Sequence, residues 1–169
     1  FLDIDGVLAP FGGRDPTPPR GNATTRRGSA EFASFDPLTL QRLSRIIDAT
    51  EAKIVLSSSW RASDSAVECI LSRFRDFGPP LDINRFEYTT DLRRHSLRQW
   101  EIAAFLAEAA VKGPRVRSWV ALDDEELVRG AENARHRSLF EERAILVESK
   151  VGLAEAHVDE AIALLLFDE

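Results

Sequence analysis

The sequence predicts an α/β fold, in which a parallel sheet is covered by helices on both faces in a three-layer, doubly wound (Rossmann-like) arrangement. Short apolar segments alternate along the chain with longer amphipathic segments, and polar residues directly follow several of the short segments. Strands covered on both faces are apolar throughout, and parallel strands need crossover connections that are usually helical. The alternation therefore favours this fold over an all-helical or all-β domain.

The size and composition of the chain are those of one soluble domain. It has 169 residues, of which 44% are apolar and 30% are charged, and a chain of this length can bury a core without disulfides or a structural metal. We therefore expect residues 1–169 to form a single domain. Cys69 has no second cysteine to pair with, which favours a reducing, cytoplasmic location. The longest apolar run, residues 161–167, is far shorter than the roughly 18–20 residues of a membrane span.

The first segment runs Phe1-Leu2-Asp3-Ile4-Asp5-Gly6-Val7-Leu8 and is typical of the end of a buried strand. A central strand of only two or three residues would be poorly paired. We therefore expect apolar residues to precede Phe1 in the natural protein. Residues 9–35 are rich in Pro, Gly, Thr and Arg, which predicts a long loop. Four arginines make this loop locally basic in an acidic protein: Arg14, Arg20, Arg26 and Arg27.

The remaining elements follow from capping residues and apolar spacing. Asp36 followed by Pro37 is a helix N-cap with proline at the first helical position, and predicts a helix that ends near residue 50. Apolar residues at helical spacing predict further helices over residues 63–76, 97–111, 125–140 and 153–166. Short apolar runs predict strands over residues 53–57, 85–90, 118–122 and 144–147.

Polar side chains follow three of the expected strands. They are Asp3 and Asp5, the run Ser57-Ser58-Ser59, and the pair Asp123-Asp124. The carboxyl ends of parallel strands share one edge of a sheet, where ligands bind. Several carboxylates at one edge repel one another unless a cation is bound or their pKa values are raised. Mg²⁺ is the natural cation, because it prefers oxygen ligands and retains water sites for a phosphate.

Each of these segments also has a purely structural interpretation. An Asp-Gly pair is a common turn, a serine run is an ordinary polar exit from a strand, and acidic residues are favoured in the first turn of a helix. Their occurrence together, at the ends of separate strands, favours a site. Trp60, Trp100 and Trp119 are interpreted as packing residues, with base stacking by Trp60 beside Arg61 as an alternative.

The order of the motifs resembles the haloacid dehalogenase-like (HAD) superfamily, in which strands lead into DxDG, into Ser or Thr, and into DD, and a helix carries a Lys or Arg. Residues 1–8, 54–61 and 119–124 match the three strand motifs, and Arg98 stands where the family places its cation. The Ser-Ser-Ser-Trp-Arg segment and the Gly152-Leu153 turn are similar to a subgroup found as a phosphatase module in RNA-repair proteins.

The resemblance implies a Mg²⁺-dependent phosphomonoester hydrolase. Asp3 would attack phosphorus to form an aspartyl phosphate, and Asp5 would protonate the leaving oxygen and later deprotonate the attacking water. Asp3, Asp123 and the backbone carbonyl of Asp5 would hold Mg²⁺, with Asp124 as a further ligand or as a partner of one. The metal residues implied are thus Asp3, Asp5, Asp123 and Asp124.

The resemblance also implies a phosphate-binding set. Ser58, with Ser59 beside it, would bind a phosphoryl oxygen, and Ser57 is the alternative one position away. Arg98 would neutralise the transferring group, although lysine is more usual in the family, and a guanidinium can bind two phosphate oxygens at once. Neighbouring alternatives for this cation are Arg93 and Arg94.

The spacing of the motifs leaves no room for a large cap domain over the site. An open mouth admits a bulky phosphate ester such as a nucleic-acid end or a phosphoprotein, and the arginine-rich loop would bind an anionic polymer. A small phosphorylated metabolite is an equal alternative. A non-catalytic phosphate-binding or interaction module is the alternative from another class, but the retention of both acidic pairs favours an enzyme. The sequence gives no prediction of oligomeric state.

Overall fold

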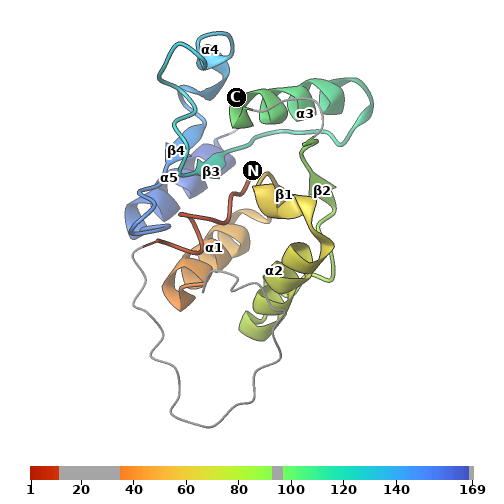
Figure 1. The fold of residues 1–169 in the computed structure, drawn as a ribbon, viewed down its shortest axis with the longest axis vertical. Helices are drawn as coiled ribbons and strands as arrows, with labels where there is room; N and C mark the ends of the chain where they lie inside the picture. Colours follow the sequence, from red (N-terminus) through yellow and green to blue (C-terminus); the bar gives the residue numbers. More distant parts are fainter. Residues whose placement is uncertain (12–34, 93–96, 168–169) are drawn as a thin grey trace.

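The computed structural model describes residues 1–11, 35–92 and 97–167 (Figure 1). The predicted loop over residues 9–35 falls largely outside the described residues, with Arg14, Arg20, Arg26 and Arg27. In chain order the elements are α1 (Pro37–Thr50), β1 (Val55–Leu56), the 3₁₀ helix η1 (Ser59–Ala62), α2 (Asp64–Phe77), β2 (Tyr88–Thr89), α3 (Arg98–Lys112), β3 (Ala121–Asp123), α4 (Arg137–Phe140), β4 (Ala144–Leu146) and α5 (Glu155–Leu166).

The strands pair in parallel, as the sequence predicts. β1 pairs with β2, and β3 pairs with β4. Leu2 forms parallel bridges to Leu56 in β1 and to Leu122 in β3. The backbone N–H of Leu2 donates to the carbonyl of Val55 at 2.9 Å, and that of Asp3 donates to the carbonyl of Leu122 at 3.0 Å. The first residues of the chain therefore lie between the two strand pairs and join them.

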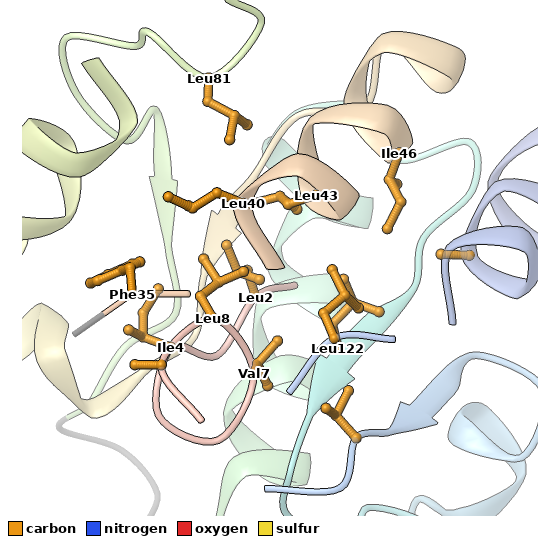
Figure 2. Packing of buried hydrophobic residues seen from close by; sticks show 14 of the residues in the cluster. Leu2, Ile4, Val7, Leu8, Phe35, Leu40, Leu43, Ile46, Leu81 and Leu122 are labelled. Atoms are coloured by element: carbon orange, nitrogen blue, oxygen red, sulfur yellow. The ribbon is translucent and has the colours of Figure 1, made fainter. Parts of the chain in front are cut away.

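Alternate residues of these strands pack into two different cores. Leu2, Leu122 and Ile145 belong to a large cluster that also contains side chains of α1, α2 and α5, part of which is shown in Figure 2. The residue before each of them, namely Phe1, Ala121 and Ala144, packs in a second cluster with side chains of α3 and α4. Because successive side chains of a strand point to opposite faces, helices pack on both faces of the strands. The complete three-layer, doubly wound sheet stays a prediction.

Four of the five predicted helices are present, each beginning within two residues of its expected start. At the start of α1, the Asp36 carboxylate accepts the backbone N–H of Leu38 at 2.8 Å, and Pro37 follows it as the first helical residue. The buried Leu40, Leu43 and Ile46 lie on one face of α1, which packs against α5 (Figure 1). No helix within the described ranges is both long enough and apolar enough to cross a membrane.

The predicted helix over residues 125–140 is wrong, because only α4 is helical there. The Glu126 carboxylate accepts the backbone N–H groups of Val128 and Arg129, and the Asn133 amide donates to the carbonyls of Glu126 and Arg129. Gly130 adopts a φ of 93°. These local bonds between side chains and backbone replace helical hydrogen bonds, and the left-handed glycine breaks the helical path.

The strands are shorter than predicted. The expected segments over residues 53–57 and 85–90 contain only the two-residue strands β1 and β2, and those over residues 118–122 and 144–147 contain the three-residue strands β3 and β4. The sequence did not predict η1, which directly follows the serines at the end of β1. These short strands end at the edge where the predicted site residues lie.

Candidate active site

A row of buried polar residues crosses the carboxyl ends of the strands. The paired leucines Leu2, Leu56 and Leu122 point into the large core cluster, and the next residue on each strand is polar. The N–H of Ser57 donates to the carbonyl of Leu2 at 3.0 Å, which continues the same register. The row lies on the opposite face from the leucines, as strand alternation requires. Its members are Thr90, Ser57, Asp3 and Asp123, each less than 5% exposed.

Three carboxylates converge at one end of this row. One oxygen each from Asp3, Asp123 and Asp124 lies within 4.8 Å of the others. Asp3 and Asp123 are buried, and Asp124 is half-buried. The turn after the first strand segment leaves space for Asp124, because Gly6 has a φ of 69° and a Cβ at this position would overlap the Asp124 carboxylate. A side chain at position 6 would therefore displace the Asp124 carboxylate from its place in the cluster.

The cluster is electrostatically unfavourable for ionised carboxylates. Burial raises the pKa of Asp123, and the neighbouring charge of Asp3 raises it further. Burial also raises the pKa of Asp124 to about 6, with Asp3 and Glu125 adding to the effect. A cation bound between these oxygens would favour their ionised forms and remove this cost.

The donor set fits a hard divalent cation. Three carboxylates provide oxygen ligands only, which suits Mg²⁺ rather than metals that prefer nitrogen or sulfur. The buried Oδ2 of Asp123 makes no hydrogen bond within the described part of the chain. Asp3, Asp123 and Asp124 are thus the residues that could hold such a cation at this edge.

Asp5 lies apart from the three clustered carboxylates. Its Oδ2 accepts a hydrogen bond from the indole N–H of Trp60 at 2.8 Å, and its side chain is half-buried. The side chain of Asp5 is not among the oxygens that converge. A contribution of Asp5 to the metal through its backbone carbonyl stays a prediction.

Arg98 begins α3 and points into the carboxylate cluster. Its Nε lies 3.0 Å from Oδ2 of Asp123, in ionic contact without hydrogen-bond geometry. One terminal nitrogen lies 3.4 Å from Oδ1 of Asp3, and the side chain is 8% exposed. The structure therefore brings Arg98 into contact with Asp3 and Asp123, and its role in neutralising a phosphate stays a prediction. The alternatives Arg93 and Arg94 lie outside the described residues.

The three serines after β1 have different surroundings. Ser57 belongs to the polar row, and its buried hydroxyl has no hydrogen-bond partner among the described residues. The Ser58 hydroxyl accepts the N–H of Trp60 at 3.4 Å and caps η1. Ser59 is exposed. Phosphate binding by Ser58 and Ser59 stays a prediction. Ser57 is the stronger candidate by hydrogen bonding, because its buried hydroxyl is the one without a partner among the described residues.

Sequence reasoning missed two buried charges that support this site. The Arg61 guanidinium donates to the backbone carbonyls of Ser57, Ser58 and Thr90 and forms an ion pair with Glu101. Oε2 of Glu101 also lies 3.6 Å from a terminal nitrogen of Arg98. Burial lowers the pKa of Arg61 and raises that of Glu101, and the attraction between the two charges opposes both shifts. The spacing of Arg98 and Glu101, three residues apart on a helix, is the signal that could have found this contact.

A cavity of about 570 Å³ lies away from the carboxylates. Its lining includes Phe1, Val55, Tyr88 and Val120, which stand at or before the amino ends of the strands. None of the three clustered aspartates lines it. The carboxylate cluster therefore lies at the opposite edge of the strands from this cavity.

The comparison with protein families agrees with this geometry. The family model for the HAD domain in Swiss Army Knife RNA repair proteins matches residues 1–158. Searches among curated proteins and among solved structures gave no match. The matched range contains the acidic pairs, the serine run and Arg98, and confirms the resemblance predicted from the motifs. The chain belongs to the family of HAD domains found in Swiss Army Knife RNA repair proteins.

Proposed function

We propose that this HAD domain is a Mg²⁺-dependent phosphomonoester hydrolase that acts through an aspartyl phosphate on Asp3. One observation carries the proposal: oxygens of Asp3, Asp123 and Asp124 lie within 4.8 Å of one another beside a buried guanidinium. Carboxylates and a fixed cation at the carboxyl ends of parallel strands suit a phosphoryl group, whose transfer depends on positioning and charge neutralisation.

Asp3, Asp123 and Asp124, with the backbone carbonyl of Asp5, are the residues that would hold Mg²⁺. When bound, the ion supplies positive charge that offsets the carboxylates and the charge on the phosphoryl group. The half-buried position of Asp124 suits either direct ligation or a hydrogen bond to a water ligand.

The protein residues then divide the reaction into two displacements. A carboxylate oxygen of Asp3 forms a bond to phosphorus while the bond to the ester oxygen breaks, and Asp5 gives its proton to that leaving oxygen. In the second displacement Asp5 takes a proton from water as the water oxygen bonds to phosphorus. The bond between phosphorus and Asp3 breaks, which releases inorganic phosphate and restores both aspartates.

Arg98 and one serine hold the phosphoryl oxygens in this proposal. Arg98 already contacts Asp3 and Asp123, so its charge is in place before a substrate binds. Among the serines we favour Ser57 over Ser58, because its hydroxyl is buried in the row that contains Asp3. Ser59, which is exposed, would contact a substrate only at the mouth of the site.

For the substrate we propose a bulky phosphate ester, and within this class the phosphorylated end of an RNA. The family description supports an RNA-repair setting, and a doubly wound domain without a large cap would leave the mouth open to a polymer end. Binding of the polymer by the arginine-rich loop and a cytoplasmic location belong to the same proposal.

Hydrolysis of an aryl phosphate, with Mg²⁺ and with EDTA, tests the reaction. We expect turnover that needs Mg²⁺ and that falls at least about 10³-fold in Asp3→Asn, since the variant removes the nucleophile. Asp159→Asn, at an exposed position of α5, is the matched control and should keep full activity. Binding of phosphate without turnover by the unmodified protein would instead identify a non-catalytic module. Oligonucleotides with 5′, 3′ or 2′ phosphates, assayed beside a panel of phosphorylated metabolites, then identify the substrate.

A further inference from the structure

Trp60 makes a directed contact with the second aspartate of the first motif. Its indole N–H donates to Oδ2 of Asp5 at 2.8 Å, although the two residues are 55 positions apart in the chain. Trp60 lies in η1, and the turn of η1 is fixed by the cap at Ser58 and by the bonds of Arg61 to the end of β1. The Trp60 ring also packs edge-on against Phe35, with ring centroids 5.9 Å apart and an interplanar angle of 86°.

These contacts restrict where the Asp5 carboxylate can point. The Trp60 ring is half-buried and is held by packing and by the turn of its backbone, so its N–H is a fixed donor. Asp5 directly precedes a turn over residues 6–8, and the N–H of Gly6 donates to the carbonyl of Ala9 at 3.0 Å, which holds the backbone there. Because the Trp60 donor and the Asp5 backbone are both held in place, the Asp5 carboxylate has one preferred rotamer. Its Oδ2 accepts the indole N–H, so its Oδ1 is the oxygen left for proton transfer. Preorganisation of this kind is how a proton donor is kept in place for its reaction.

We infer that Trp60 is a positioning residue that orients Asp5 as the proton donor to the leaving oxygen. The inference rests on the proposed function, in which Asp5 protonates the ester oxygen as Asp3 attacks phosphorus. The packing role that the sequence suggests for Trp60 accounts for the ring but not for the bond between its N–H and a carboxylate. Loss of the Trp60 N–H should therefore lower the rate most for substrates whose leaving oxygen is protonated as its bond to phosphorus breaks.

Leaving-group dependence separates this role from a structural one. A nitrophenolate leaves without much help from an acid, whereas an alkoxide needs its proton during bond cleavage. The ratio of kcat/KM for p-nitrophenyl phosphate to kcat/KM for an alkyl phosphate therefore reports the proton donor, because kcat/KM covers the first displacement only. A general loss of folded protein or of metal binding lowers both values and leaves the ratio unchanged.

The variant to test is Trp60→Phe, which keeps an aromatic ring and removes the N–H. We expect kcat/KM for the alkyl phosphate to fall about tenfold and kcat/KM for the aryl phosphate to fall less than about threefold. The tenfold loss is a part of the roughly 10²–10⁴-fold acceleration that a general acid provides. In the Asp5→Asn background, Trp60→Phe should change the ratio less than about twofold, because there is no donor left to orient. Trp119→Phe, whose ring packs on Phe1 and Phe140, is the matched control and should leave the ratio unchanged.

The possible outcomes distinguish the inference from the function on which it rests. Full activity of Asp3→Asn, or an unchanged ratio in Asp5→Asn, overturns the proposed mechanism. If Asp5→Asn changes the ratio and Trp60→Phe does not, the mechanism stands and the role of Trp60 is wrong.

A spectroscopic measurement keeps the inference testable if Trp60→Phe does not fold. The chain has three tryptophans, so the indole N–H region of its ¹H–¹⁵N spectrum is simple. In Asp5→Asn the Trp60 resonance should shift more than those of Trp100 and Trp119. An unchanged Trp60 resonance would show that the bond to Asp5 is absent in solution, and would overturn the inference.

Discussion

At the scale of single residues, Gly6 leaves the space that the Asp124 carboxylate occupies in the cluster. Its φ of 69° lies in the left-handed region, and a Cβ there would overlap the Asp124 carboxylate. An aspartate-glycine pair in a sequence indicates a turn, but only the structure shows that the missing side chain is what admits Asp124. Gly6 thus affects the site in two ways: it adopts the backbone conformation of the turn, and it leaves room for the Asp124 side chain.

Gly6→Ala should weaken Mg²⁺ binding and lower the free energy of unfolding by about 1–3 kcal/mol, the range for a residue held in a strained backbone conformation. Gly78→Ala is the matched control, because Gly78 also has a positive φ of 92° but its Cβ would meet nothing within 4 Å. Urea unfolding and Mg²⁺ titration of both variants provide the measurement. Equal Mg²⁺ affinity in Gly6→Ala and the unmodified protein would contradict the role of the overlap with Asp124.

The raised pKa values of Asp123 and Asp124 predict how stability depends on pH in EDTA. Both carboxyls bind protons more tightly in the folded chain than in the unfolded chain, where an aspartate titrates at about 3.9. The folded state therefore carries more bound protons above that value, and the free energy of unfolding falls as the pH rises through it. For Asp124 the decline is complete once the pH has passed its folded pKa of about 6.

Asp124→Asn should show a shallower fall in stability between pH 4 and pH 7, by roughly 1 kcal/mol after allowance for the solvent exposure of this half-buried group. Urea midpoints measured in EDTA at several pH values for both proteins provide the test. A difference of the opposite sign would mean that the folded chain favours the ionised Asp124 carboxylate even without a cation.

At the scale of elements, Arg61 joins β1, β2 and α3 at the edge of the strands that holds the site. Its guanidinium contacts backbone carbonyls after both strands and the Glu101 carboxylate on α3, and its side chain is only 3% exposed. A short polar turn after a strand gives no indication in the sequence that a charge will be buried there. The sequence therefore does not predict that Arg61 is buried.

Arg61→Met should lower the free energy of unfolding by about 3–5 kcal/mol, because it leaves the Glu101 carboxylate buried without its main partner. Combining it with Glu101→Gln should cost less than the sum of the two single changes, since both remove the same interaction. Arg45→Met is the matched control, because Arg45 pairs with Glu155 at the surface and such pairs contribute about 0–1 kcal/mol. Urea unfolding of these four variants and of the unmodified protein provides the measurement, and equal losses in Arg61→Met and Arg45→Met would contradict this role.

The helices show which elements the sequence could predict. α1 and α2 have capping residues and a clear apolar stripe, and local signals of this kind do not depend on the rest of the chain. The segment over residues 125–140 also has apolar residues at helical spacing, but Glu126 and Asn133 bond to nearby backbone groups instead. Such competition between side chain and backbone is decided by local geometry that spacing alone does not contain.

At the scale of the whole molecule, the site depends on the parallel order of the strands. Asp3, Ser57 and Asp123 are far apart in the sequence, yet Leu2 bridges both Leu56 and Leu122 and so aligns the residues that follow them. The sequence predicted that these strand ends share an edge. It did not give the register, and therefore left the choice among the three serines open and missed the position of Thr90. The contact of Trp60 with Asp5 also needed the fold, because η1 was not predicted.

Calorimetric titration with Mg²⁺ alone tests most directly whether the three clustered aspartates form one metal site. We expect one ion to bind per chain, with the affinity lowered at least about tenfold in Asp123→Asn and unchanged in Asp159→Asn. Absence of Mg²⁺ binding by the unmodified protein, or equal affinity in Asp123→Asn, would contradict it.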